Sequence, residues 1–279
     1  MRILLAPDKF KDALPAEQVV KAIKEGIHFF NPDIEAISLP MADGGEGTAQ
    51  ILTHYYQGAF HEATVHDPLM RKIKASYGLS PDKKIAFIEM ATASGLELLK
   101  PAERNCYFTS SYGTGELIKA AIQAGAEQII LGIGGSATCD GGIGMAAALG
   151  YEFTDKEGNK LKPTGENLSS IYQIDDQHVD SRISEIEILV ACDVDNLLTG
   201  PSGAAQTYAP QKGADNEQVE SLDEGLGHLS KLITAKYNLD IANIPGSGAA
   251  GGLGGGAKAF LVSSLRTGTD LILELLQVW

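Results

Sequence analysis

Strand and helix patterns of hydrophobic residues alternate over the first 56 positions. Residues 2–6 form a continuous apolar run, as a strand buried on both faces of a parallel sheet does, and residues 34–39 predict a second strand. Between them, after Pro15, apolar residues recur at helical spacing until Asn31-Pro32 ends the segment. Another helix follows the loop 40–47 and extends to about Tyr56. This order predicts a parallel sheet.

The pattern changes from residue 60 onward. Three strand-like segments are joined by short turns, which implies antiparallel pairing, at residues 60–67, 72–79 and 84–90. Residues 128–133 and 186–192 are again apolar runs typical of buried strands. Helices are expected at residues 143–149, 216–237 and 257–265. The fold class predicted is therefore α/β, with a parallel part and a second part that contains a mixed sheet.

Residues 270–279 have the pattern of an apolar helix without a C-cap or a basic last turn. A helix with so much apolar surface is expected to pack under a following element, and none follows in the sequence. We therefore expect the chain to stop within a domain. We also expect the uncovered face of this helix to favour a homodimer or aggregation.

Composition and charge restrict the class of partner. The formal net charge is −14, which argues against nucleic acid and against an anionic membrane surface. No apolar stretch approaches the roughly 20 residues needed to span a bilayer, and the N-terminus lacks a signal-peptide pattern. The three cysteines are widely spaced and form no CxxC motif, so we expect a reduced, cytoplasmic protein. The 32 glycines are an excess, and they cluster in loops.

The densest glycine cluster, GIGGSATCDGGIG, is called here the first glycine loop (residues 132–144). It follows a predicted strand and precedes a helix, where backbone N–H groups and the helix dipole hold phosphate. The candidate nucleotide-binding residues are Gly134, Gly135, Ser136 and Thr138, and Asp140 is a candidate Mg²⁺ ligand. Read as GxGxxA, the loop also fits a dinucleotide-binding fingerprint, with Glu152 or Asp155 about 20 residues on. A tight strand-to-helix turn without a ligand is the third interpretation.

Five other segments place glycine, acid or lysine at a strand end or a helix start. The second glycine loop (residues 246–256) supplies Gly246, Gly248, Gly251 and Gly252 as further nucleotide-binding candidates; the alternative is a flexible linker. The loop 40–47 carries Asp43, a candidate metal ligand that could be a mere helix cap. Beyond the predicted strands lie the remaining candidates Asp8, Lys9, Lys11, Asp193 and Lys212. Acids, lysines and glycine loops together suggest phosphoryl transfer, although no GxxxxGK motif of a P-loop is present.

Taken together, these segments resemble the bacterial glycerate kinase family, which lacks a Walker motif. The resemblance covers essentially the whole chain and is carried, in the family's order, by APDKFKDALPAEQ, PMADGGEGT, DPLMR, IEMATASGLELL, TSSYGTGELI, GIGGSATCDGGIGMAAALG, CDVDNLLTGPSGA, APQKGAD and PGSGAAGGLGGG. It implies ATP- and Mg²⁺-dependent phosphorylation of D-glycerate, usually at the 2-hydroxyl, giving 2-phosphoglycerate. It also implies a Rossmann-like domain, residues 1–65 plus about 266–279, with a second α/β domain inserted at residues 66–265.

Within that resemblance the residues receive roles. Mg·ATP would lie on the two glycine loops, and Asp193 or Asp8 would orient or deprotonate the attacking hydroxyl. The carboxylate of glycerate would bind to cations, for which the candidates are Lys9, Lys11, Arg71 and Lys212.

The chain also departs from the family's pattern. Met70 replaces a glycine, Cys139 an asparagine and Leu197 a proline. The family's sequence continues beyond residue 279, so the chain is expected to be truncated. Two alternatives remain at this stage: a dinucleotide-dependent oxidoreductase, and a catalytically incomplete kinase fragment that only binds ligand.

Overall fold

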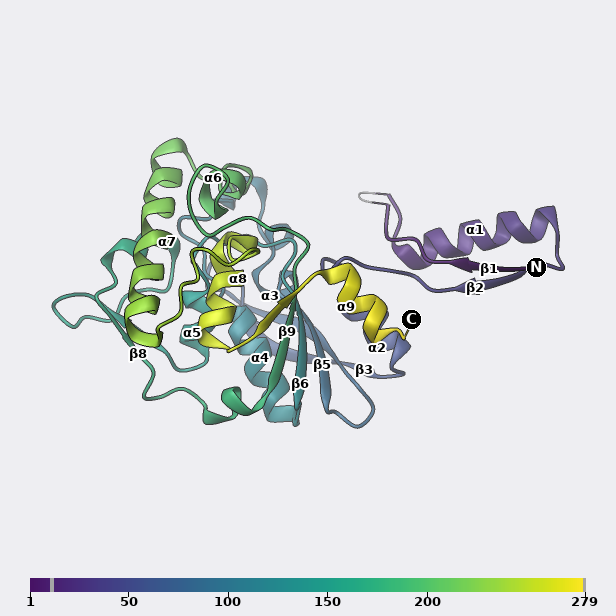
Figure 1. Ribbon diagram of the computed structural model, residues 1–279, viewed down its shortest axis with the longest axis horizontal. Coiled ribbons are helices and arrows are strands. Elements are labelled where there is room, and N and C mark those ends of the chain that lie inside the picture. Colours follow the sequence, from purple (N-terminus) through teal and green to yellow (C-terminus); the bar gives the residue numbers. More distant parts are fainter. Residues whose placement is uncertain (11–12, 278–279) are drawn as a thin grey trace.

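A six-stranded mixed sheet forms the centre of the molecule (Figure 1). The computed structural model describes residues 1–10 and 13–277. The strand order is β10-β9-β6-β5-β4-β3, in which β5, β6, β9 and β10 run parallel and β3 and β4 are antiparallel. The strands are β3 (Ala59–His66), β4 (Lys72–Leu79), β5 (Ile85–Glu89), β6 (Gln128–Gly132), β9 (Glu187–Ala191) and β10 (Ser264–Arg266). The α/β class, the antiparallel segment and the apolar parallel strands are confirmed.

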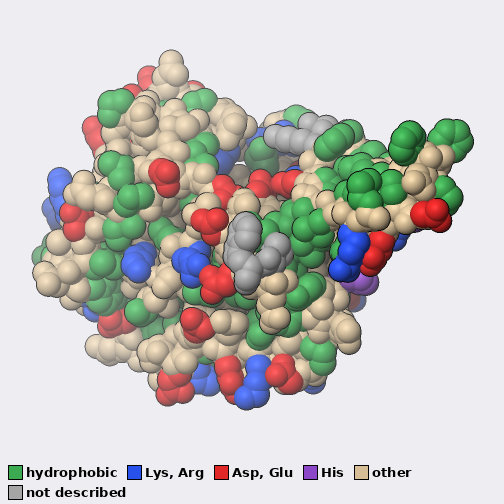
Figure 2. Space-filling model, turned by 45° about the vertical axis from the view of Figure 1, so that its right-hand side comes forward, with side chains coloured by type: hydrophobic (Ala, Val, Ile, Leu, Met, Phe, Trp, Pro, Cys, Tyr) green, Lys and Arg blue, Asp and Glu red, His purple; other side chains and the backbone are tan. Residues whose placement is uncertain are grey.

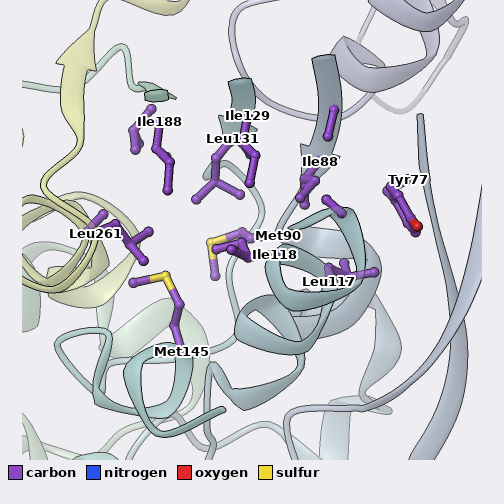
Figure 3. Packing of buried hydrophobic residues seen from close by; sticks show 14 of the residues in the cluster. Tyr77, Ile88, Met90, Leu117, Ile118, Ile129, Leu131, Met145, Ile188 and Leu261 are labelled. Carbon is purple, nitrogen blue, oxygen red and sulfur yellow. The ribbon is translucent and has the colours of Figure 1, made fainter. Parts of the chain in front are cut away.

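Helices cover both faces of this sheet. On one face lie α4 (Tyr112–Ala124), α5 (Ile143–Ala148) and α8 (Ala249–Phe260), whose apolar residues pack against Ile88, Ile129 and Leu131 (Figure 3). On the other face lie α2 (Thr48–Tyr55) and α9 (Gly268–Leu275), which pack against Phe87 and Ile130. Residues 87–88 and 129–131 thus alternate between the faces, as a strand requires. Each fully buried side chain of this kind stabilises the fold by about 1.5–3 kcal/mol.

The N-terminal unit is a separate strand-helix-strand layer that projects from the body (Figure 1). It consists of β1 (Arg2–Leu5), α1 (Ala16–Phe30) and β2 (Glu35–Ser38), as the hydrophobic pattern predicts, and β1 and β2 are parallel. Leu5, Val20 and Ala36 form its small core. The division of the whole chain into two domains stays a prediction.

A second layer lies outside α5 and α8. The predicted surface helix is α7 (Asn216–Tyr237), which begins at a capping box between Asp215 and Gln218 and buries Leu222, Leu226 and Leu229. The remaining elements are α3 (Ala91–Ser94), α6 (Ala204–Tyr208) and the antiparallel pair β7 (Glu152–Thr154) and β8 (Gln173–Asp175). Within the described residues, no helix is both long and apolar enough to cross a bilayer.

Two expectations for the last third of the chain are wrong. The helix expected at residues 257–265 is α8, which begins earlier and ends at Phe260, so that residues 264–266 are free to form β10 beside β9. The helix expected at residues 270–279 is α9, and its apolar face is not uncovered. Leu271, Ile272 and Leu276 are buried on the central sheet, and the hydroxyl of Tyr55 donates a hydrogen bond of 2.7 Å to the carbonyl of Leu276.

Candidate active site

The loops that carry most candidate residues meet at one edge of the sheet. Strands β5, β6 and β9 are in register through Glu89, Gly132 and Ala191, so their carboxyl ends lie side by side. Ligands of open α/β sheets bind at such an edge.

The loop 43–47, which precedes α2, is folded directly onto this edge. A Cβ on Gly132 would lie 2.5 Å from the carbonyl oxygen of Gly44, and one on Gly134 would lie 2.8 Å from the Cα of Gly45. Glycine at both positions therefore permits two backbones to approach more closely than side chains allow.

A cavity of about 420 Å³ opens between these loops; it is called here the site cavity. Candidate residues from four separate segments line it, namely Asp43, Gly134, Gly135, Ser136, Asp193 and Lys212. Acidic side chains also gather around the hollow between the body and the N-terminal unit (Figure 2). The fold thus brings into one cavity the glycines, the cation and two of the carboxylates that the sequence singled out.

Lys212 supplies a buried cation to the site cavity. Its residue is only 4% exposed, and its Nζ donates hydrogen bonds to Ser136 Oγ (2.7 Å) and to the carbonyl of Thr138 (2.8 Å). Burial lowers the pKa of Lys212, because desolvation disfavours the charged form. These two bonds hold the ammonium beside the first glycine loop, where it can bind an anion.

The first glycine loop faces the cavity with its front half, residues 134–136. Gly135 has φ of +71°, a conformation that glycine adopts without strain. Within residues 1–10 and 13–277, no protein acceptor takes the N–H of Gly134 or Gly135. Successive free N–H groups next to a buried lysine are suited to binding phosphate or carboxylate oxygens.

Asp43 and Asp193 bring two carboxylates to the same cavity. The Oδ1 of Asp193 accepts the N–H of Gly268 at 2.8 Å, and that of Asp43 accepts the N–H of Gly45 at 2.9 Å. Partial burial raises the pKa of Asp193; N–H groups of Gly268 and Thr269 oppose the rise, and the charge on Asp43 adds to it. Because the negative charge on Asp43 acts on Asp193, a cation beside both carboxylates would be stabilised.

This donor set fits Mg²⁺. Magnesium is usually bound by one or two carboxylates, with phosphate oxygens and water completing the octahedron. Within the part of the chain that the structure describes, no group of three or more His, Cys, Asp or Glu side chains could hold a metal without such added ligands.

The back half of the first glycine loop is buried. Asp140 is fully buried, and its carboxylate accepts hydrogen bonds from the N–H groups of Ser111 (2.7 Å), Gly142 (3.1 Å) and Gly144 (3.2 Å) and from the Ser111 hydroxyl (2.8 Å). Burial raises the pKa of Asp140 and these bonds oppose the rise. The carboxylate of Asp140, a candidate metal ligand, is therefore hydrogen-bonded within the protein and does not face a cavity. Thr138 is likewise fully buried.

The second glycine loop packs against that back half. A Cβ on Gly251 would lie 2.1 Å from the carbonyl oxygen of Thr138, and one on Gly252 would lie 2.8 Å from a methyl group of Leu226. Gly248 donates its N–H to the carbonyl of Asn196 at 2.9 Å, and Gly246 is buried. Of this segment, Ala249 and Ala250 reach the site cavity. The four candidate glycines thus serve close packing, and their nucleotide-binding role stays a prediction.

The remaining candidates lie elsewhere. Asp8 and Lys9 line a second cavity of about 670 Å³, between the N-terminal unit and the body, together with Glu46 and Glu89. The Nζ of Lys9 is 3.2 Å from both the carbonyl oxygen and Oε2 of Glu46. Arg71 pairs with Asp67 and Glu103, outside both cavities, and Lys11 lies outside the described residues.

Among the lining residues that were not singled out from the sequence, three carry polar groups suited to a site. Tyr208 and Gln211 line the site cavity, and Glu89 lines the second. The signal for Glu89 was available, because it is an acid at the carboxyl end of a predicted strand, as Asp193 nearly is. Tyr208 and Gln211 gave no such signal, since they reach the cavity only through the fold of α6 and the turn after it.

The structure also bears on the dinucleotide interpretation. Strand β6 ends at Gly132 and α5 begins at Ile143, so residues 133–142 form a long irregular loop. A dinucleotide fingerprint requires the helix to follow the strand at once, with its third small residue packed between them.

The comparisons with known proteins all point to the same family. The model of the glycerate kinase family matches residues 3–279. The chain is 45% identical over 272 residues to glycerate 2-kinase of Escherichia coli K12, covering 98% of this chain and 71% of that protein. It is 47% identical over 272 residues to glycerate kinase of Halalkalibacterium halodurans, covering 98% of this chain and 72% of that protein. A crystal structure of a protein provisionally named glycerate kinase 2, from Salmonella typhimurium LT2, aligns with a TM-score of 0.93 at 45% identity, covering 100% of this chain and 74% of that one. Phosphotransfer thus replaces the oxidoreductase alternative, and the chain belongs to the glycerate kinase family.

Proposed function

We propose that this chain transfers the γ-phosphate of ATP to the 2-hydroxyl of D-glycerate, with Mg²⁺, in the cytoplasm. The observation that carries the proposal is the convergence of free glycine N–H groups, a buried lysine and two carboxylates in one cavity at the carboxyl edge of the sheet. The 2-position follows the name of the Escherichia coli relative, glycerate 2-kinase. Three free thiols, Cys106, Cys139 and Cys192, agree with a reducing compartment.

The phosphates of ATP lie on the N–H groups of Gly134 and Gly135, and Lys212 neutralises their charge. Phosphoryl transfer depends mainly on positioning and on electrostatic stabilisation, so a buried lysine held by two hydrogen bonds is well suited to the task. Burial strengthens its interaction with an anion because water screens the charge less there.

Asp43 is the magnesium ligand in this proposal, and Asp193 acts on the substrate. Bound Mg²⁺ supplies charge neutralisation at the phosphates. Asp193 accepts the proton of the 2-hydroxyl, whose oxygen forms the new bond to the γ-phosphorus as the bond to the β,γ-bridging oxygen breaks. Partial burial raises the pKa of Asp193, which favours its role as the proton acceptor. Asp140 is left out because four protein donors already occupy its oxygens.

The two cavities adjoin at the loop 43–47, and glycerate is proposed to bind across their junction. Asp43, Gly44 and Gly45 line one cavity, and Glu46 and Gly47 line the other. Lys9 is the cation proposed for the carboxylate of glycerate, with Glu46 as its present partner. Arg71 is less suited because Asp67 and Glu103 already neutralise its charge.

The decisive experiment measures ADP formation from Mg·ATP by the purified chain, with and without D-glycerate, and identifies the product by ³¹P NMR. Glycerate-dependent ADP and 2-phosphoglycerate are expected. A folded chain that binds ATP but forms no ADP would contradict the proposal and favour a protein that only binds ligand.

The role of Asp193 is tested with Asp193→Asn and, as the matched control, its exposed neighbour in Asp195→Asn. Loss of the base is expected to lower kcat by roughly 10²- to 10⁴-fold, and the control is expected to retain wild-type turnover. Turnover of Asp193→Asn within a few-fold of wild type would show that another group acts on the hydroxyl.

A further inference from the structure

Helix α2 begins without a cap of its own. Its N-cap is Gly47, which has no side chain and has φ of +94°, a conformation that disfavours other residues. The first N–H groups of a helix need acceptors from outside it. Here the acceptor comes from the central sheet, because Oε1 of Glu89 accepts the N–H of Ala49 at 2.7 Å.

Glu89 is placed for this task by the sheet itself. It is the last residue of β5, in register with Gly132 of β6, and only 9% of it is exposed. A buried carboxylate is costly unless it is hydrogen-bonded, and the N-terminus of a helix offsets the cost through N–H groups and the helix dipole. Burial raises the pKa of Glu89, and the bond from Ala49 opposes the rise.

The same bond fixes the first turn of α2, into which the loop 43–47 leads directly. On the other side, Lys9 of the N-terminal unit contacts the carbonyl oxygen of Glu46 at 3.2 Å. Glu89 therefore ties the loop to the sheet edge, whereas Lys9 ties it to the N-terminal unit. A loop released from the sheet would carry Asp43 away from Asp193.

We propose that Glu89 is a positioning residue for phosphoryl transfer, which anchors the loop 43–47 so that Asp43 faces Asp193 across the site cavity. The inference rests on the proposed function, since Asp43 matters only if the cavity performs the transfer.

The test compares Glu89→Ala, Glu89→Gln and a matched surface control, Glu62→Ala, whose exposed side chain pairs with that of Lys74. A small displacement of a reacting group lowers turnover roughly 100-fold, so kcat of Glu89→Ala is expected to fall by about 10- to 100-fold at a temperature well below its Tm, with the KM for ATP within a few-fold of wild type. The half-saturating Mg²⁺ concentration is expected to rise. Glu89→Gln is expected to recover most of kcat, because its amide oxygen still accepts the N–H of Ala49.

Two outcomes would overturn the proposal. If folded Glu89→Ala keeps wild-type kcat and Mg²⁺ dependence, Glu89 is only a helix cap. If Glu89→Gln is as impaired as Glu89→Ala, the charge of Glu89 acts on the reactants directly.

Hydrogen exchange of residues 43–52, followed by mass spectrometry, tests the anchor independently of activity. Exchange is expected to be about 10-fold or more faster in Glu89→Ala than in Glu62→Ala or the wild type. Unchanged exchange would overturn the anchoring role. Faster exchange in a chain without glycerate-dependent ADP formation would retain the anchor and refute the proposed function instead.

Discussion

The two glycine loops have similar compositions and different surroundings. The front half of the first glycine loop, residues 134–136, lines the site cavity and leaves the N–H groups of Gly134 and Gly135 without protein acceptors in the described part of the chain. The second glycine loop is almost wholly buried, and its backbone contacts residues 138–141 of the first loop. The front half of the first loop thus presents unpaired backbone N–H groups to the cavity, whereas glycine in the second loop brings two chain segments together.

Glycine density alone therefore does not identify a ligand loop. What a Cβ would meet differs between Gly135 and Gly256, although Gly134 in the same front half is packed within 2.8 Å of the Cα of Gly45. At Gly135 the nearest atom is the Cβ of Ala91 at 3.3 Å, whereas at Gly256 the carbonyl oxygen of Gly141 lies at 2.2 Å. A methyl group at Gly135 would need only a small shift of Ala91 but would be strained by the φ of +71°, whereas one at Gly256 could not fit without backbone movement.

The largest expected effect is the loss of stability in Gly251→Ala. The new Cβ would clash with the carbonyl of Thr138 at a residue with φ of +69°, so the free energy of unfolding is expected to fall by roughly 3–5 kcal/mol. The control is Gly158→Ala, which has φ of +82° but no atom within 4 Å of the Cβ, and which is expected to lose about 1 kcal/mol. Urea unfolding measures both. Equal losses would show that the second glycine loop is not held by close packing.

The next effect separates the loops by function. Lys212→Met removes the cation beside the first glycine loop, and kcat/KM for ATP is expected to fall by roughly 10²- to 10³-fold. Stability is expected to change little, because the variant also removes a buried charge and its desolvation cost. Lys231→Met, on the exposed side of α7, is the control. If Lys212→Met keeps kcat/KM within a few-fold of wild type, the nucleotide does not lie on the first loop.

A pH profile sharpens the same contrast. The second glycine loop contains no titratable side chain, whereas the first lies beside Lys212, whose pKa burial lowers from its usual value of about 10.4. The protonated form binds the anion, so kcat/KM for ATP is expected to fall as pH rises through this lowered pKa. Lys212→Arg should keep its charge and retain activity to higher pH. If kcat/KM for ATP falls at the same pH in Lys212→Arg as in the wild type, the fall is due to the titration of another group.

The hydrophobic pattern predicted most of the sheet and several helices. The limits of α7 follow from Asp215 with Gln218 at the start and Asn238 in the left-handed region at the end, which are signals local to the sequence. The start of α8 could not be predicted in this way. Residues 253–256 are helical although three of them are glycine, because burial between α5 and the segment around Gly246 decides their conformation.

The sequence predicted which segments form the site better than it predicted the role of each residue. Parallel strands place their ends together, so Ser136 after β6 and Asp193 after β9 converge as expected from the topology. Asp43 follows β2 of the separate two-stranded sheet and Lys212 lies in the turn after α6, so these two reach the cavity through tertiary packing. Whether an acid faces a cavity or the interior depends on tertiary contacts. The pattern DGG gave no sign that Asp140 accepts four protein hydrogen bonds, or that Glu89 caps a helix distant in sequence.

The smallest expected effect isolates the energetic cost of positive φ, a backbone conformation that occurs in both glycine loops. Met70 has φ of +63° and is 44% exposed, in a turn where Oδ1 of Asp67 accepts the N–H groups of Leu69 (2.9 Å) and Arg71 (2.8 Å). Met70→Gly is expected to raise the free energy of unfolding by about 0.5–1 kcal/mol, since relief of left-handed strain exceeds the added entropy of the unfolded chain. Met70→Ala, which keeps the strain, controls for loss of the side chain. If both variants shift the urea midpoint equally, positive φ is not a cost at this turn, and the penalty assigned to Gly251→Ala must come from the clash alone.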